Sequence, residues 1–237
     1  MANPNPYPYV RPNGAAAAGA ATDLRSYLIR VYNYMAGGLV VTGATAYYGA
    51  ASGFYARTIG TPLSWIILLA PLALVLLLSY RIQRMSVAAA QVSFWAYSAL
   101  VGLSLSGIFL IYTGQSIGQV FFVTGGMFAA ASLYAHTTRR DLSRLGSFMV
   151  MGLFGLIIAS VVGMFLHSTA LQMTISVMGV IVFTGLTAYQ TQMIRALYVQ
   201  GEDGTVAAKK SILGALMLYL NFLNLFLSLL RLMGQRR

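Results

Sequence analysis

Residues 146–166 read GSFMVMGLFGLIIASVVGMFL, and no Lys, Arg, Asp or Glu interrupts them. As an α-helix this stretch would rise about 30 Å, because each residue adds about 1.5 Å, and that length matches the hydrocarbon core of a bilayer. Lipid cannot satisfy backbone N–H and C=O groups, and the continuous apolarity lacks the alternation of a barrel strand. The stretch therefore predicts a transmembrane α-helix.

Six further apolar stretches of similar length occur along the chain. They are Val31–Ser52, Pro62–Tyr80, Val87–Tyr112, Ser116–Ala135, Leu171–Ile194 and Ile212–Met233. The whole chain is 58% hydrophobic and only 8% charged, which is far from the composition of a soluble globular protein. The sequence predicts an all-α integral membrane protein with about seven transmembrane helices.

The N-terminal segment differs in composition from the rest of the chain. Residues 1–23 are rich in Pro, Asn, Tyr and Ala and contain no apolar run of signal-peptide type. We expect a disordered tail over residues 1–23 and a single transmembrane domain over residues 24–237.

The net charge of +11 comes from fifteen Lys and Arg residues against four acidic ones. These charges lie singly or in small groups between the apolar stretches, so they favour an orienting role and anionic lipid headgroups over nucleic acid as a partner. With a cytoplasmic N-terminus, eleven basic residues lie inside and four outside if the last stretch crosses fully. The four are Arg57, Arg231, Arg236 and Arg237. If the last stretch re-enters instead, fourteen lie inside; its length favours crossing.

Few residues could support catalysis or metal binding. There is no cysteine, and His136 and His167 are predicted at opposite ends of the bundle. The four acids all lie in predicted inner segments. They are Asp23, Asp141, Glu202 and Asp203. No carboxylate pair, nucleophile pair or metal-ligand set can be assembled from these positions, so we expect neither an enzyme nor a cofactor.

Small residues spaced by four often mark close packing between membrane helices. Gly155, Ala159 and Gly163 form one such series, and Gly126 and Ala130 begin another. We expect helix packing along both series.

Neutral polar residues form two stripes on the last two predicted helices. Thr184, Thr187 and Thr191 recur at helical spacing with Gln190 beside them. The second stripe comprises Asn221, Asn224 and Ser228. The stripes fit hydrogen bonding between helices, worth about 0.6 to 2 kcal/mol per contact, and they equally fit the lining of a hydrated path.

Four blocks of sequence resemble the bacterial (YccA-like) branch of the Bax inhibitor-1 family, also called the transmembrane Bax inhibitor motif family. They are LRSYLIRVYNYM at 24–35, TTRRDLSRLG at 137–146, GLTAYQTQ at 185–192 and LYLNFLNLFLSLLRL at 218–232. The resemblance implies six helices around a central C-terminal helix in a bacterial inner membrane. It also implies a role in cation homeostasis, notably calcium leak, or in stress response.

The sequence departs from the family at two positions. The resemblance places a carboxylate in the sixth-helix motif and another in the last helix, where this chain has Gln190 and Asn221. An amide keeps the shape and hydrogen bonding of a carboxylate but cannot titrate and attracts Ca²⁺ less strongly. We hypothesise that Gln190 and Asn221 form a neutral latch between the last two helices.

Two functions remain open at this point. One is a passive leak for calcium or another cation. Its candidate pore or latch residues are Gln190, Asn221, Thr187, Thr191, Asn224 and Ser228. The other is a non-conducting role, in which the bundle binds and modulates another membrane protein or membrane-protein quality control.

Overall fold

The computed structural model describes residues 14–166 and 168–237, and of residues 14–21 the backbone alone. Regular structure in these residues is helical, apart from an isolated bridge between Tyr112 and Arg236. The helices are α1 (Gly14–Ala51), α2 (Phe54–Thr58), α3 (Pro62–Arg81), η1 (Ile82–Arg84), α4 (Val87–Leu105), α5 (Ile108–Ile111), α6 (Gly114–Thr137), α7 (Ser143–Leu166), α8 (Thr169–Ala196) and α9 (Gly204–Met233). The predicted all-α class is confirmed.

Each predicted apolar stretch lies in helical structure, with two differences. Helix α1 begins at Gly14 and so includes part of the tail predicted for residues 1–23, while residues 1–13 and His167 lie outside the described residues. The predicted span over 87–112 is confirmed as one membrane-crossing segment over Val87–Ile111, but it is not a continuous helix, because α4 ends at Leu105 and α5 follows after a break. At the break, a Cβ on Gly107 would lie 2.7 Å from the Tyr55 hydroxyl, so a larger residue does not fit there.

Polar side chains cap the starts of several membrane helices. The Ser86 hydroxyl accepts a hydrogen bond from the Ala89 N–H at the start of α4, and Thr113 accepts one from Ser116 N–H at the start of α6. Ser168 and Asp203 cap α8 and α9 in the same way. These caps satisfy backbone donors that would otherwise be left free at helix ends.

Six of the described helical segments are long and apolar enough to cross a bilayer: α3 with η1, α4 with α5, and each of α6, α7, α8 and α9. Helix α1, which contains the predicted span 31–52, is less apolar than these six segments, because Tyr, Gly and Asn dilute its apolar residues. The structure is thus an all-α membrane protein in which six spans are clear by length and composition.

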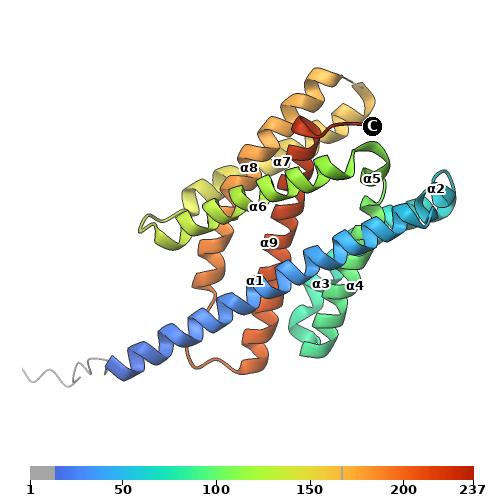
Figure 1. The fold of residues 1–237 in the computed structure, drawn as a ribbon. Helices are drawn as coiled ribbons and strands as arrows, with labels where there is room; N and C mark the ends of the chain where they lie inside the picture. The colour runs from blue at the N-terminus through green and yellow to red at the C-terminus, as the bar shows by residue number, and fades with distance from the viewer. Residues whose placement is uncertain (1–13, 167) are drawn as a thin grey trace, which may run out of the picture.

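Helix α9 is the centre of the bundle, as predicted for the C-terminal helix (Figure 1). Two thirds of its most apolar stretch is buried, against 11% to 39% in the other five spans. It packs directly against α1, α4, α6 and α8, whereas α3 packs on α4 and α7 packs on α8. The central helix therefore has an inner ring of four neighbours, with α3 and α7 further out.

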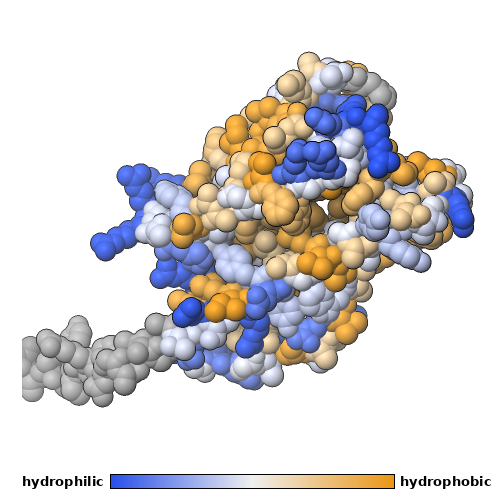
Figure 2. Space-filling view, in the orientation of Figure 1, coloured by the Kyte–Doolittle hydropathy of each residue, from blue (hydrophilic) through white to orange (hydrophobic). Residues whose placement is uncertain are grey.

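The outer helices expose large apolar side chains. Trp65, Leu69 and Leu76 of α3 and Phe148 and Phe154 of α7 are all more than half exposed. Figure 2 shows apolar residues over much of one face and strongly hydrophilic clusters towards its ends. Such a surface is suited to lipid in its middle zone and to water at the two ends.

The predicted small-residue packing is wrong for two of its glycines. A Cβ on Gly126 or Gly155 would meet no atom within 4 Å, so both face open space. Close helix approach occurs elsewhere, at glycines that the spacing rule did not select. At Gly102, a Cβ would overlap the Thr45 hydroxyl of α1 and lie 2.5 Å from the Thr42 carbonyl oxygen. Spacing alone does not show which face of a helix meets a neighbour.

Candidate functional site

The two predicted polar stripes meet at Gln190 on α8 and Asn221 on α9. The Asn221 side-chain amide donates a hydrogen bond to the Gln190 side-chain oxygen over 3.0 Å. Asn221 is 4% exposed and Gln190 is half-buried. Two neutral amides can satisfy each other in this way without the large cost of burying a charge.

Two of the three threonines of the α8 stripe, Thr187 and Thr191, are almost fully buried, but their hydroxyls have different partners. The Thr187 hydroxyl donates to the Phe183 carbonyl of its own helix over 2.7 Å. The Thr191 hydroxyl lies 3.3 Å from the Ser132 hydroxyl of α6. Thr191, the residue directly after Gln190, thus joins α8 to α6, whereas Thr187 does not reach a neighbouring helix. The buried Thr184 hydroxyl has no hydrogen-bond partner among the described residues.

The remaining residues of the α9 stripe bond to their own helix. The Asn224 side-chain amide donates to the Leu220 carbonyl, and the Ser228 hydroxyl donates to the Asn224 carbonyl, each over 2.8 Å. Opposite Ser228 is Gly179 of α8, where a Cβ would lie 2.5 Å from the Ser228 oxygen. A glycine at 179 therefore allows α8 to approach α9 closely at this level.

A groove follows this part of α9, between α7 and α9 and with α8 as its floor. It consists of two adjoining cavities of about 320 and 430 Å³, which share Ser160, Met164, Ile175 and Arg231 in their linings. Only the first extends inward to Asn224 and Ser228. Because Asn224 follows Asn221 by three residues, about 4.5 Å along the helix axis, the groove ends close to the Gln190–Asn221 pair.

The groove and the pair lie between the two ends of the bundle. At one end, Lys209 at the start of α9 donates to the Gln83 carbonyl after α3, and Arg195 of α8 donates to the His136 carbonyl of α6. At the other end, the C-terminal segment pairs with the start of α6, where the Thr113 N–H donates to the Gln235 carbonyl. Helix α9 therefore runs from end to end, as expected if the last stretch crosses fully.

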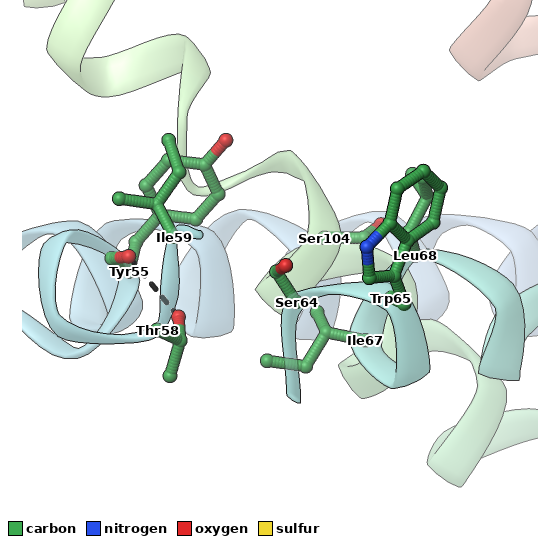
Figure 3. A pocket seen from close by; sticks show the side chains of 8 residues that line it. All are labelled: Tyr55, Thr58, Ile59, Ser64, Trp65, Ile67, Leu68 and Ser104. Atoms are coloured by element: carbon green, nitrogen blue, oxygen red, sulfur yellow. Dashed lines mark hydrogen bonds between the residues drawn. The ribbon is translucent and has the colours of Figure 1, made fainter. Parts of the chain in front are cut away.

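A smaller cavity of about 180 Å³ lies at the same end as the C-terminus, between α2, α3 and α4 (Figure 3). Its walls include Tyr55, Trp65 and Leu68, together with the hydroxyls of Ser64 and Ser104. Tyr and Trp side chains with mixed apolar and polar surface are typical of the membrane–water interface. This cavity is separate from the groove along α9.

A second polar cluster, which the sequence did not reveal, joins three helices. The Tyr219 hydroxyl of α9 lies 2.6 Å from the Thr42 hydroxyl of α1, and Thr42 donates to the Ser98 carbonyl of α4. Ser132 of α6 was also missed. It follows Ser116 and Thr124 at intervals of eight residues, and all three are buried, so that spacing was an available signal.

Titratable groups do not gather within the spans. Among residues 14–166 and 168–237, no group of three or more His, Asp or Glu side chains comes together in a geometry that could hold a metal ion. The ion pair found in the described residues joins Lys210 and Glu202, at the end of the bundle that also holds Lys209. The polar interior is therefore built from amides and hydroxyls.

These features define a class: a polytopic all-α membrane protein with a central helix that bears neutral polar residues. Comparison with known proteins gives the family. Residues 24–237 match the family model described as "Inhibitor of apoptosis-promoting Bax1", and the chain belongs to this Bax inhibitor-1 family.

Relatives at high identity come from several bacteria. The chain is 46% identical over 218 residues to the inner membrane protein YbhL of Escherichia coli (strain K12), covering 90% of this chain and 93% of that protein. It is 45% identical over 215 residues to an uncharacterized protein of Rickettsia prowazekii, covering 90% and 91% of the two chains. An uncharacterized protein of Caulobacter vibrioides is 41% identical over 244 residues, with 97% of each chain covered.

Proposed function

We propose that this protein is a slow passive leak for calcium or other cations in a bacterial inner membrane, with its N-terminus in the cytoplasm. The observation that carries the proposal is the Gln190–Asn221 hydrogen bond between α8 and the central helix, close to the inner end of the α7–α9 groove. The inner-membrane location follows the name of the YbhL relative. The orientation follows the excess of basic residues at the end that holds Arg195 and Lys209.

The chemistry of the pair suggests weak and slow conduction. Side-chain carbonyl oxygens of Asn and Gln are ligands for Ca²⁺, but without a negative charge they attract it less than a carboxylate does. The Asn221–Gln190 hydrogen bond occupies one of these oxygens, so a passing cation must first break it. The pair therefore acts as a latch that opens rarely.

The pair also determines the expected response to pH. Neither amide titrates, so this leak has no protonation switch at 190 and 221. Two aspartates at these positions would share a small space, and one of them would have a raised pKa. Proton binding would then compete with cation binding.

The test is flux of calcium and potassium into liposomes that contain the purified protein, at about pH 6 and pH 8. We expect slow, pH-independent flux from the wild type. The Gln190→Asp and Asn221→Asp double variant should conduct faster than the wild type, and its flux should be larger at the higher pH than at the lower one. A matched control, Asn33→Asp with Gln83→Glu, adds two acidic groups at exposed positions away from the pair and should behave as the wild type. Unchanged flux in the 190/221 variant would overturn the role of the pair.

The hydrogen bonds also support a second candidate, a membrane protein that binds and modulates another one without conducting. Thr187, Asn224 and Ser228 all donate to carbonyls of their own helix, which is how polar residues in a purely structural bundle are satisfied. This candidate predicts no flux from either the wild type or the double variant, together with a membrane-protein partner that co-purifies stoichiometrically. Neither candidate gives the protein a catalytic role.

A further inference from the structure

We propose that the groove between α7 and α9 binds one phospholipid with an anionic headgroup. The phosphate lies beside Arg231 and one acyl chain extends along the groove towards Asn224. The inference concerns lipid binding itself, and it holds whether or not the protein conducts cations.

The groove has the length of one lipid leaflet. Its α7 wall runs from Leu153 to Met164, which is about 17 Å of helix at 1.5 Å per residue. Half of the hydrocarbon core of a bilayer is about 15 Å thick. An acyl chain that enters from the C-terminal end of α9 therefore reaches the inner end of the groove without leaving its leaflet.

The groove is apolar along this length. Ile157 and Val161 of α7, Phe183 of α8 and Leu227 of α9 contribute to its walls. The polar residues at its inner end, Asn224 and Ser228, each donate a hydrogen bond to a carbonyl of α9, which lowers the cost of covering them with an acyl chain.

The groove is open to the side where lipid lies. Helix α7 packs mainly against α8 and makes little contact with α9, which leaves a gap between the two helices. Ile157, Val161 and Met164 are each more than half exposed along its edge. A lipid can therefore enter laterally from the bilayer.

The headgroup end of the groove carries an uncompensated positive charge. Arg231 lines both cavities, and Ser160 and Gln172 supply neutral hydrogen-bonding groups next to it. The four acidic side chains of the chain all lie at the opposite end of the bundle. Asp23 is in the first half of α1, Asp141 precedes α7, and Glu202 and Asp203 precede α9. Among the described residues Arg231 forms no salt bridge, and an anionic headgroup complements its charge.

The experiment is native mass spectrometry of the purified full chain in detergent, titrated with phosphatidylglycerol or phosphatidylethanolamine of identical acyl chains. We expect one tightly bound lipid and a preference for phosphatidylglycerol. In Arg231→Gln this preference should fall about fivefold, which corresponds to about 1 kcal/mol for one basic residue near the membrane surface. Arg231→Lys should retain most of it.

Two controls separate this site from general charge and bulk effects. Arg236→Gln removes the same charge from the exposed C-terminal segment and should leave the preference unchanged. Ser160→Phe fills the groove and should abolish tight lipid binding. Ser147 is exposed on the same helix outside the groove, so Ser147→Phe should leave lipid binding unchanged. Helix content by circular dichroism confirms that each variant is folded.

Three results would overturn the inference: equal binding of the two lipids by the wild type, an undiminished preference in Arg231→Gln, or a retained tight lipid in Ser160→Phe. Glycerol phosphate without acyl chains should not displace the lipid at equal concentration. Efficient displacement by it would show an anion site alone, and would also contradict the proposal.

Discussion

The hydroxyl of Tyr219 on the central helix lies 2.6 Å from the hydroxyl of Thr42 on α1, and both side chains are buried. Thr42 directs its single proton towards the carbonyl oxygens of Ser98 and Gly38, at 2.9 and 2.8 Å. The Thr42 oxygen is then available as an acceptor, so we assign the Tyr219 hydroxyl as the donor in this bond. The Tyr219 and Thr42 hydroxyls together thus link α9, α1 and α4 at the centre of the bundle.

Replacing this phenol should weaken the bundle. We expect Tyr219→Phe to lose about 1 kcal/mol of stability, because it removes one buried hydrogen bond while keeping the ring and its packing. Thermal unfolding of the detergent-solubilised protein measures the effect. Tyr80→Phe, on a side chain 82% exposed, is the matched control and should leave the unfolding temperature unchanged. Equal effects of the two changes would contradict the network.

Substitution by alanine should have opposite effects on stability at glycines in helix crossings and at glycines that face lipid. Gly102→Ala pushes a methyl group against the backbone of Thr42, so it should destabilise the protein by about 1 to 3 kcal/mol. Gly155→Ala meets open space and should stabilise α7 by about 0.5 to 1 kcal/mol, because alanine loses less backbone entropy in a helix. The two unfolding temperatures should therefore move apart, and a shift in the same direction would count against the α1–α4 crossing.

Gln192 holds the segment between α6 and α7. Its side-chain oxygen accepts from the Leu142 N–H over 2.8 Å, and its amide donates to the Arg140 carbonyl over 2.9 Å. Gln192→Ala should free this segment and raise the rate of trypsin cleavage after Arg139 and Arg140. Gln192→Glu keeps the acceptor but loses the donor, so we expect an intermediate rate. Cleavage at the wild-type rate in the alanine variant would exclude this role.

The stability of the folded protein should depend on pH through Asp203, which lies at the start of α9. Its carboxylate accepts a hydrogen bond from the Thr205 N–H over 3.0 Å, and this bond lowers the pKa of Asp203 below its ordinary 3.8. Because folding lowers the pKa, the charged carboxylate stabilises the folded protein above pH 3.8, and this contribution is lost as the pH falls through the lowered value.

Asn at position 203 can also cap the helix but does not titrate. We therefore expect wild type to unfold at a higher temperature than Asp203→Asn at about pH 7, and the difference to close at acid pH. Other acids titrate equally in both proteins, so the difference isolates Asp203. A gap that persists at low pH would be inconsistent with this account.

Much of the fold could be predicted from local composition. A helix in lipid must satisfy its own backbone, so an apolar stretch of sufficient length, such as residues 146–166, predicts a helix without knowledge of its neighbours. The span over 87–112 was predicted correctly, but the break in its helix at Ser106 and Gly107, beside Tyr55, was not. That break depends on a contact with α2 and leaves no mark in the hydrophobicity of the chain.

The candidate site was only partly accessible to sequence reasoning. The stripe on α9 and the Gln190–Asn221 positions were selected from periodicity and a family resemblance, and the structure brings that pair together. The partner of Thr191, Ser132, lies on another helix, and the bond between Tyr219 and Thr42 joins residues far apart in the chain. Neither pairing follows from spacing along one helix.

The sequence by itself determined that the chain is a bundle of membrane helices with a neutral polar interior, because helix formation in lipid and the absence of mid-span charges are local properties. The tertiary structure decided which side of each helix faces protein. Helices α3 and α9 are both strongly apolar, yet the most apolar stretch of α3 is 11% buried and that of α9 is 67% buried. Lipid and protein interior are equally apolar, so hydrophobicity cannot separate the two environments, and only the packing of α1, α4, α6 and α8 around α9 does so.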